Sequence, residues 1–518
     1  MRFDRHILSI VLLIATLAYT LWFVFAGFGN HLDPLYWLYK YEHLEGGWMA
    51  VGTLLTGGAI VRLFGLELLP LRIAGWLCVT AAIAMPYCTL LDRDTRRTNL
   101  HWLALTYLLM GYGAFQEFSP GTLTVLLLSA IWVTVFKSSI FHQQSSIFTA
   151  LLAGLAITVR FPNILVLLIL IPLWKKRSLW LVPIAALTAG VVYLLGYLII
   201  TPAPLDAAMT SHELTSMITK LWENLGKLLG FMLMSIGVLA FPLREKRYAG
   251  WFVGAALALF IIYTLKPYQW YNADLTYLIS AFCIVLAFCT PYTVHHTPYT
   301  PEGRLGFAIL MVATLGTDTA WLKLFPAVLC LLPVALSQYR EFSYRRYLLQ
   351  IIIVLSGVVI ARMTTNSIAQ SNLTKATIFA SVSPYRGIAI RPAEQSRLLQ
   401  YKADYDSLTN DQMVNDQMVN ILALGQELHL MRAVTGCEAA RYNEFWSNIF
   451  DSVYTAKYEP IIEAERPVVF CSFSPMFKTK PSYTDRESRM EQMLRSHGYH
   501  EIDRSKYKYM IYIPQSNE

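Results

Sequence analysis

The first polar segment of the chain carries the carboxylates best placed for acid–base chemistry. Asp33 lies in His31-Leu32-Asp33-Pro34-Leu35-Tyr36-Trp37, directly after an apolar run from Ile7 to Gly27, and Glu42 and Glu45 follow within a few helical turns. A carboxylate beside a membrane can take a proton from a hydroxyl. We therefore predict that Asp33 is a general base, and that Glu42 or Glu45 assists it or binds hydroxyl groups. The structural alternatives are a solvated or helix-capping role for Asp33, and the polar face of an interface helix for the two glutamates.

Two arginines further along the chain could stabilise a negatively charged leaving group. Arg160 ends an apolar half-span and precedes Phe161-Pro162. A cation near a helix break at membrane depth is a functional candidate, whereas snorkelling to the interface is the alternative. Arg72 opens an apolar run and either anchors the head of that span or contacts a phosphate.

Three more residues are predicted to contact a substrate. Lys266 and Tyr271 lie in the cationic and aromatic stretch 266–271, which is typical of sugar or phosphate binding but also of the interfacial aromatic belt. Asp318 lies in a second break between apolar runs, where a carboxylate suggests a hydroxyl partner or an ion pair.

The composition indicates that these residues are carried by a membrane protein. Hydrophobic residues make up 55% of the 518-residue chain and charged residues only 15%, against roughly 25% charged in soluble domains. The mean hydropathy is +0.43. The net charge of +8 lies mostly in short loops between apolar runs, where it sets orientation, so it does not indicate nucleic-acid binding.

Hydropathy predicts about 13 spans, because a span needs about 20 mainly apolar residues. The first run leads into further spans without a cleavage site, which favours a retained helix. Two pairs, 146–174 and 306–338, are short halves joined by polar breaks that we expect to face one polar cavity. The predicted spans are 7–27, 69–91, 102–117, 120–137, 146–159, 163–174, 178–200, 225–243, 249–265, 275–292, 306–317, 322–338 and 348–363.

The distribution of Lys and Arg predicts the orientation. With the N-terminus inside, sixteen of these residues fall in inner loops and eight in outer loops up to residue 347, as the positive-inside rule requires. The segment 46–66 would invert this pattern if it were a span. We therefore expect it to be an amphipathic or re-entrant helix in the outer interface.

The last 150 residues or so differ from the rest and predict a small extracytoplasmic α/β domain. They contain strand-like runs at Val419–Leu424, Pro467–Phe473 and Tyr507–Ile513, alternating with helix-like runs at Glu394–Tyr405, Arg441–Tyr454 and Asp485–Gly498. The expected division is a transmembrane domain over 1–363, with a first outer loop over 28–68, and the α/β domain over 364–518. Cys437 and Cys471 of this domain are either bridged or free.

The order of these features resembles the GT-C superfamily of integral membrane glycosyltransferases, which includes protein O-mannosyltransferases and lipid A aminoarabinose transferases. The resemblance is carried by one span, an acidic outer loop, a surface helix that ends in Leu63-Phe64-Gly65, and Leu71-Arg72 at the next span. The stretch 154–160, Gly-Leu-Ala-Ile-Thr-Val-Arg, and the outer C-terminal domain add to it.

The resemblance implies a polyprenyl-phosphate sugar donor, transfer on the outer face of the membrane, and an acidic catalytic residue in the first outer loop. Asp33 occupies that position. Many members carry there an acidic pair or an acid followed directly by an aromatic residue, whereas here Asp33 is single and is followed by Pro34. The acceptor would be a lipid, a glycan or a protein, and the location a bacterial inner membrane with a periplasmic C-terminal domain. No zinc-ligand spacing indicates a metal, so metal dependence stays open.

Two other classes of membrane protein remain open. A lipid-linked glycan polymerase or ligase also has many spans, but more often places its main outer loop late between spans. A secondary transporter also has broken helices, but usually shows repeated halves. No nucleotide-binding glycine motif is present, which counts against an ATP-driven pump.

Overall fold

The computed structural model describes most of the helical part of the chain and segments of the C-terminal part. The described residues are 5–27, 33–46, 48–110, 118–140, 142–174, 179–202, 214–239, 246–264, 273–288, 301–314, 324–338, 342–365, 375–412, 421–425, 430, 433–434, 452–472, 491–502 and 509–515.

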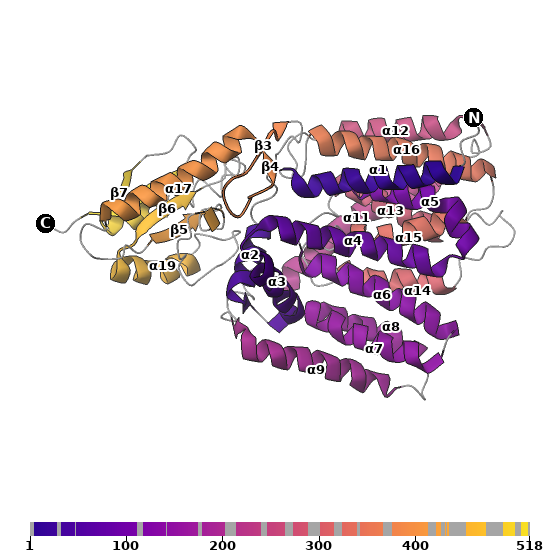
Figure 1. Ribbon diagram of the computed structural model, residues 1–518, viewed down its shortest axis with the longest axis horizontal. Coiled ribbons are helices and arrows are strands. Elements are labelled where there is room, and N and C mark those ends of the chain that lie inside the picture. Colours follow the sequence, from indigo (N-terminus) through magenta and orange to yellow (C-terminus); the bar gives the residue numbers. More distant parts are fainter. Residues whose placement is uncertain are drawn as a thin grey trace.

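A bundle of long apolar helices forms the larger part of the molecule (Figure 1). Pairs that are distant in sequence pack side by side, such as α1 with α5 and α12 with α16. Its helices are α1 (Arg5–Phe25), α4 (Leu68–Leu90), α5 (Arg93–Leu109), α6 (Pro120–Ile140), α7 (His142–Val159), α8 (Val166–Leu173), α9 (Leu181–Ile199), α11 (Leu214–Leu239), α12 (Ala249–Thr264), α13 (Ala273–Phe288), α14 (Pro301–Met311), α15 (Leu324–Gln338) and α16 (Phe342–Thr365).

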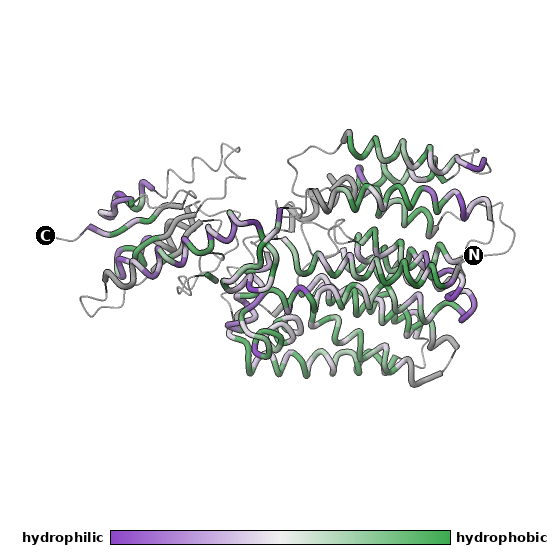
Figure 2. Tube along the Cα trace, turned by 45° about the horizontal axis from the view of Figure 1, so that its top comes forward, coloured by the Kyte–Doolittle hydropathy of each residue, from purple (hydrophilic) through white to green (hydrophobic). Residues whose placement is uncertain are grey.

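The bundle has the length and hydropathy of a polytopic membrane protein. Among the described residues, four helices are long and apolar enough to cross a membrane, and nine apolar helices of 10–17 residues accompany them. Helix α9 has a mean hydropathy of 2.0, but only 17% of its most apolar stretch is buried inside the protein. Since water-soluble surfaces do not expose such apolar area, this helix faces lipid. Figure 2 shows hydrophobic residues along the helices and hydrophilic ones mainly at the bundle ends and in the C-terminal region.

The break after Val159 separates two helices that cross the bundle independently. Tyr193 donates to the Ile157 carbonyl, and Gly154 lies against Ala185 of α9. Residues later in α7 therefore lie beside residues later in α9, so the two helices run parallel. The segment between them, η2 (Phe161–Leu165) with α8, must therefore return in the opposite direction.

One predicted span begins earlier than the sequence suggested. Hydropathy placed it at 102–117, whereas α5 starts at Arg93. The Asp92 carboxylate accepts a hydrogen bond of 2.8 Å from the Thr95 backbone N–H, which is a standard helix N-cap. This cap lets the polar residues before 102 continue the helix, and a hydropathy window cannot detect such a start.

Basic residues gather at the bundle end that carries the N-terminus. His6 contacts the Arg97 carbonyl, Arg96 donates to the Cys88 carbonyl, and Arg345 donates to the side chain of Asn99. The N-terminus, the start of α5 and the start of α16, all predicted to lie inside, therefore meet at one end of the bundle. Their side of the membrane stays a prediction. The opposite end carries the segment between α1 and α4.

That segment forms two helices at the end of the bundle. Helix α2 (Asp33–His43) and helix α3 (Val51–Phe64), with η1 (Trp48–Ala50) between them, pack on each other. At the start of α3, Val51 lies against Gly196 near the end of α9, and Thr53 donates to the Val159 carbonyl at the end of α7. Helix α3 thus lies across helix ends, in agreement with the expected surface helix over 46–66.

The C-terminal region forms a small mixed sheet flanked by helices. Its strands are β5 (Ile421–Gly425), β6 (Val468–Ser472), β7 (Tyr499–Ile502) and β8 (Tyr509–Pro514), in the order β5-β6-β8-β7, and only β5 and β6 are parallel. The helices are α17 (Pro392–Gln412) and α19 (Ser452–Glu465), and a ribbon of β3 (Ile378–Phe379) and β4 (Ala389–Ile390) precedes them. The three predicted strands are confirmed. The predicted helix Arg441–Tyr454 lies almost entirely outside the described residues.

The C-terminal region packs directly on the same bundle end as α2. The Gly27 N–H donates to the Ala389 carbonyl at 2.7 Å, and the Leu68 N–H donates to the Pro384 carbonyl at 2.8 Å. Leu35 and Leu38 of α2 share one buried apolar cluster with Tyr401 of α17. This cluster fixes α2 between the bundle and the sheet region.

Candidate functional site

Helix α2 carries the proposed base at its first residue. It begins at Asp33, followed by Pro34, a favourable residue for the first turn of a helix. The same placement fits a capping role, and the side chain of Asp33 lies outside the described part of the structure.

Close packing fixes the position of α2. Tyr41 is fully buried and its hydroxyl donates to the Phe118 carbonyl at 2.9 Å. A Cβ built on Gly57 of α3 would lie 2.4 Å from the Tyr41 ring, so only glycine allows this approach. The Phe118 N–H in turn donates to the Leu71 carbonyl of α4. Helix α2 is therefore held to α3, α4 and the start of α6.

The two predicted assisting glutamates lie in different settings. Glu42 is exposed, and its carboxylate lies 3.5 Å from the His43 ring nitrogen. Glu45 lies in β1 (Glu45–Gly46), which pairs in parallel with β2 (Thr201–Pro202) beyond α9. Its backbone thus ties this loop to α9, while its side chain lies outside the described part. Their assisting roles stay predictions.

Arg72 is buried in the contact between α1 and α4. Only 8% of the residue is exposed, and its Nη1 donates a hydrogen bond of 2.9 Å to the Gly27 carbonyl. The bond satisfies a backbone acceptor where α1 has ended. This is the anchoring arrangement that the sequence allowed as an alternative, and a phosphate contact of Arg72 stays a prediction.

Arg160 joins two segments that lie far apart in the chain. It adopts an extended conformation before η2, and its Nη1 donates to the Ala313 carbonyl of η5 (Val312–Thr314) at 2.8 Å. The bonded atoms belong to residues 153 positions apart in the chain. The break after Val159 and η5, the short 3₁₀ segment that follows α14, therefore lie next to each other. The second predicted break, 316–319, lies outside the described residues.

Asn163 fixes the backbone conformation of the break after Val159, a role that the sequence did not indicate. It is fully buried, and its side-chain amide donates to the Ala156 carbonyl at 2.8 Å and to the Thr124 hydroxyl at 3.0 Å. Its backbone N–H donates to the Arg160 carbonyl. These bonds fix the turn from which the Arg160 side chain extends.

A second contact missed by the sequence reading connects the C-terminal region to the head of α4. Glu67 Oε1 lies 3.6 Å from Arg386 Nε, and the Ser383 hydroxyl donates to the Leu66 carbonyl. Burial raises the pKa of Glu67, and Arg386 and Ser383 only partly offset this effect. Single residues that meet across more than 300 positions leave no periodic signal in a sequence.

Three predicted site residues, Lys266, Tyr271 and Asp318, lie outside the described residues. The described part brings α2, the surface helix α3 and the Arg160 break to one bundle end. Across that part, no group of three or more His, Cys, Asp or Glu is arranged to hold a metal ion. A separate cavity of about 630 Å³ lies in the C-terminal region, lined by Arg495, Gly498, Tyr499, His500, Glu501 and Gln515.

Comparison with known proteins gives similarity in structure but none in sequence. No protein-family model matches the sequence, and neither does any curated protein. Two solved structures of ArnT from Cupriavidus metallidurans, one bound to undecaprenyl phosphate and one in the apo state, align over 98% of both chains. Their sequence identities are 10% and 12%, and their TM-scores 0.40 and 0.41. Similarity at this level does not establish a shared activity, so the function is inferred from the residues of this chain.

Proposed function

We propose that this protein transfers a sugar from a polyprenyl-phosphate donor to an acceptor at the membrane face on which its C-terminal region lies. The observation that carries the proposal is the convergence at one bundle end. Helix α2, which begins at Asp33, packs on α3, and α3 bonds to the end of α7. Arg160 follows α7 directly and bonds to η5. A candidate base and a candidate phosphate-binding cation are thus supported on one connected framework.

The chemistry follows from these two groups. The carboxylate of Asp33 takes the proton of an acceptor hydroxyl as that oxygen forms a bond to the anomeric carbon of the sugar. The bond between this carbon and the phosphate oxygen breaks, and the polyprenyl phosphate leaves with the electron pair. Arg160 stabilises the charge that develops on the departing phosphate. The donor class rests on the sequence resemblance, and Arg72, Lys266, Tyr271, Asp318, Glu42 and Glu45 are proposed to bind the substrates.

A transfer assay tests the proposal against its alternatives. Purified protein is incubated in detergent with radiolabelled candidate polyprenyl-phosphate sugars and a mixture of lipid, glycan and protein acceptors. We expect label to move from the lipid to one acceptor class, and nucleotide sugars to give no transfer. Lack of transfer with every donor, together with uptake of a solute into proteoliposomes, would support a transporter instead.

The orientation is a separate proposal with its own measurement. An odd number of spans places the C-terminal region opposite the basic N-terminal end, so we expect Glu518 to lie outside the cytoplasm. A reporter enzyme that folds only outside the cytoplasm should be active when fused after Glu518. Activity of the matched cytoplasmic reporter at the same position would overturn this topology and the outer placement of Asp33.

A further inference from the structure

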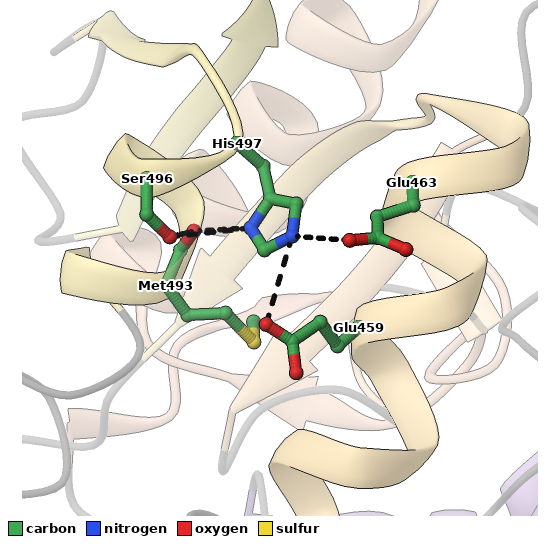
Figure 3. A network of polar contacts seen from close by, with 5 residues as sticks. All are labelled: Glu459, Glu463, Met493, Ser496 and His497. Atoms are coloured by element: carbon green, nitrogen blue, oxygen red, sulfur yellow. Dashed lines mark hydrogen bonds and ion pairs between the residues drawn. The ribbon is translucent and has the colours of Figure 1, made fainter.

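A histidine and two glutamates face each other between two elements of the C-terminal region. His497 follows a short helical segment at 491–496 that leads into β7. Glu459 and Glu463 are one helical turn apart on α19, the helix that precedes β6. Figure 3 shows both carboxylates pointing toward the imidazole ring. The ring therefore connects α19 to the segment that precedes the edge strand β7.

The oxygen atoms around the ring require a proton on both of its nitrogens. Nδ1 lies 2.8 Å from the Met493 carbonyl oxygen, which can only accept a hydrogen bond. Nε2 lies 3.1 Å from Glu463 Oε1 and 3.6 Å from Glu459 Oε1. A neutral imidazole has one N–H, so it would present a lone pair to an oxygen on one side. The Ser496 hydroxyl lies 3.3 Å from Nδ1 but donates its proton to the Met493 carbonyl at 2.7 Å. Only the imidazolium form therefore satisfies the oxygen atoms on both sides of the ring.

Among the described residues of this region, Arg495 and Arg466 have hydrogen-bond or ion-pair partners of their own. Arg495 of the same segment lies 2.6 Å from Glu491 and 3.9 Å from Glu501 of β7. Arg466, which follows α19, donates to the Gln515 carbonyl beyond β8. The ring itself is shielded, with 16% of its side chain exposed, while Glu459 and Glu463 are 43% and 63% exposed. The cation that faces the two glutamates is therefore the protonated His497.

We propose that His497 is a proton-operated clamp: when protonated, it holds α19 against the segment that precedes β7, and when it loses its proton, this contact opens. The clamp would make local stability of the C-terminal region depend on the pH of the compartment into which it projects. The inference does not depend on the proposed enzymatic activity.

The direction of the pH dependence follows from linkage. The hydrogen bond to the Met493 carbonyl and the nearby carboxylates raise the pKa of His497 above its usual value, although desolvation opposes them. The free histidine has a pKa of about 6.5. Below that pH the histidine is charged in both the closed and the open form, and the clamp contributes its full stabilisation of the closed form. This stabilisation is lost as the pH rises through the raised pKa.

Hydrogen exchange of the full-length protein in detergent tests the clamp. Exchange of peptides covering 452–465 and 491–502 is measured between pH 5.5 and 9, in EDTA, and corrected for the intrinsic exchange rates. We expect protection of both peptides to fall with rising pH, by roughly 1.5- to fivefold for each exposed ion pair lost. A peptide covering β6 is the internal reference and should keep its protection.

Three variants make the test specific. His497→Gln should show low protection of both peptides at every pH, and Glu459→Gln with Glu463→Gln should flatten the pH dependence while keeping the histidine. His500→Gln, an exposed histidine on β7, is the matched control and should behave as wild type. Protection in the wild type that does not change with pH, or that changes equally in the His497→Gln variant, would overturn the proposal.

Discussion

Asp33→Asn is expected to abolish sugar transfer while leaving the protein folded and inserted. The amide has nearly the size of the carboxylate but cannot accept a proton from the acceptor hydroxyl. General base catalysis typically raises a rate by 10²–10⁴-fold. Turnover of Asp33→Asn should therefore fall by at least about that factor. Because α2 starts at Asp33 and asparagine is an equally good helix cap, a capping role alone would survive the substitution. The measurement is turnover at saturating donor.

Matched variants separate the base from its surroundings. Asp94→Asn removes an exposed carboxylate from the first turn of α5, at the opposite end of the bundle, and should retain the wild-type activity. Unfolding temperature in detergent should be unchanged in both variants. Turnover near the wild-type rate in Asp33→Asn would remove Asp33 from the role of base, and Glu42 and Glu45 would become the next candidates.

Arg160→Ala is expected to weaken use of the donor by roughly tenfold to a hundredfold. A charge-assisted contact to a phosphate contributes about 1.5–3 kcal/mol, which converts to that range. Arg160→Lys should restore part of the loss if only the charge matters, and little if the phosphate is bound by two guanidinium nitrogens. The measurement is donor affinity and turnover of the purified variants.

Arg62→Ala is a suitable control for this experiment. Arg62 is an exposed arginine in the last turn of α3, so its loss removes the same charge without touching the break after Val159. The Arg160→Ala variant also loses the bond to the Ala313 carbonyl, and the unfolding temperature reports that structural part. Unchanged donor affinity in both Arg160 variants would mean that Arg160 only joins the break after Val159 to η5, and Arg72 or Lys266 would be tested for the phosphate.

The helices of this protein could be predicted well because their signal is local. Long apolar runs gave α1, α4 and α9 within a few residues, since lipid leaves few alternatives to a helix. Alternation of strand-like and helix-like runs gave β5, β6 and β8 in the same way. The start of α5 was missed because it depends on capping by one side chain, Asp92, which accepts from the Thr95 backbone N–H and hydroxyl. Strand β7 was missed because Tyr499–Ile502 is only four residues long and half polar.

The candidate site could be predicted only in part because its assembly depends on contacts between distant residues. Charge patterning predicted Asp33 and Arg160 at the same membrane face, and the polar breaks within apolar runs predicted a shared cavity. It could not show that Arg160 donates to Ala313, or that Arg72 bonds to Gly27. Nor could it show that the absence of a side chain at Gly57 admits Tyr41. Each of these contacts depends on one atom pair, and neither composition nor periodicity encodes such pairs.

The lipid that the reaction releases is the most direct test of the proposed sugar transfer from a polyprenyl-phosphate donor. In the assay described above, the lipid released per sugar transferred is identified by mass spectrometry. We expect one polyprenyl monophosphate for each sugar that appears on the acceptor, and neither product with Asp33→Asn. Release of a polyprenyl diphosphate from a diphosphate-linked donor, with no turnover of monophosphate-linked sugars, would contradict the account and favour a glycan polymerase or ligase.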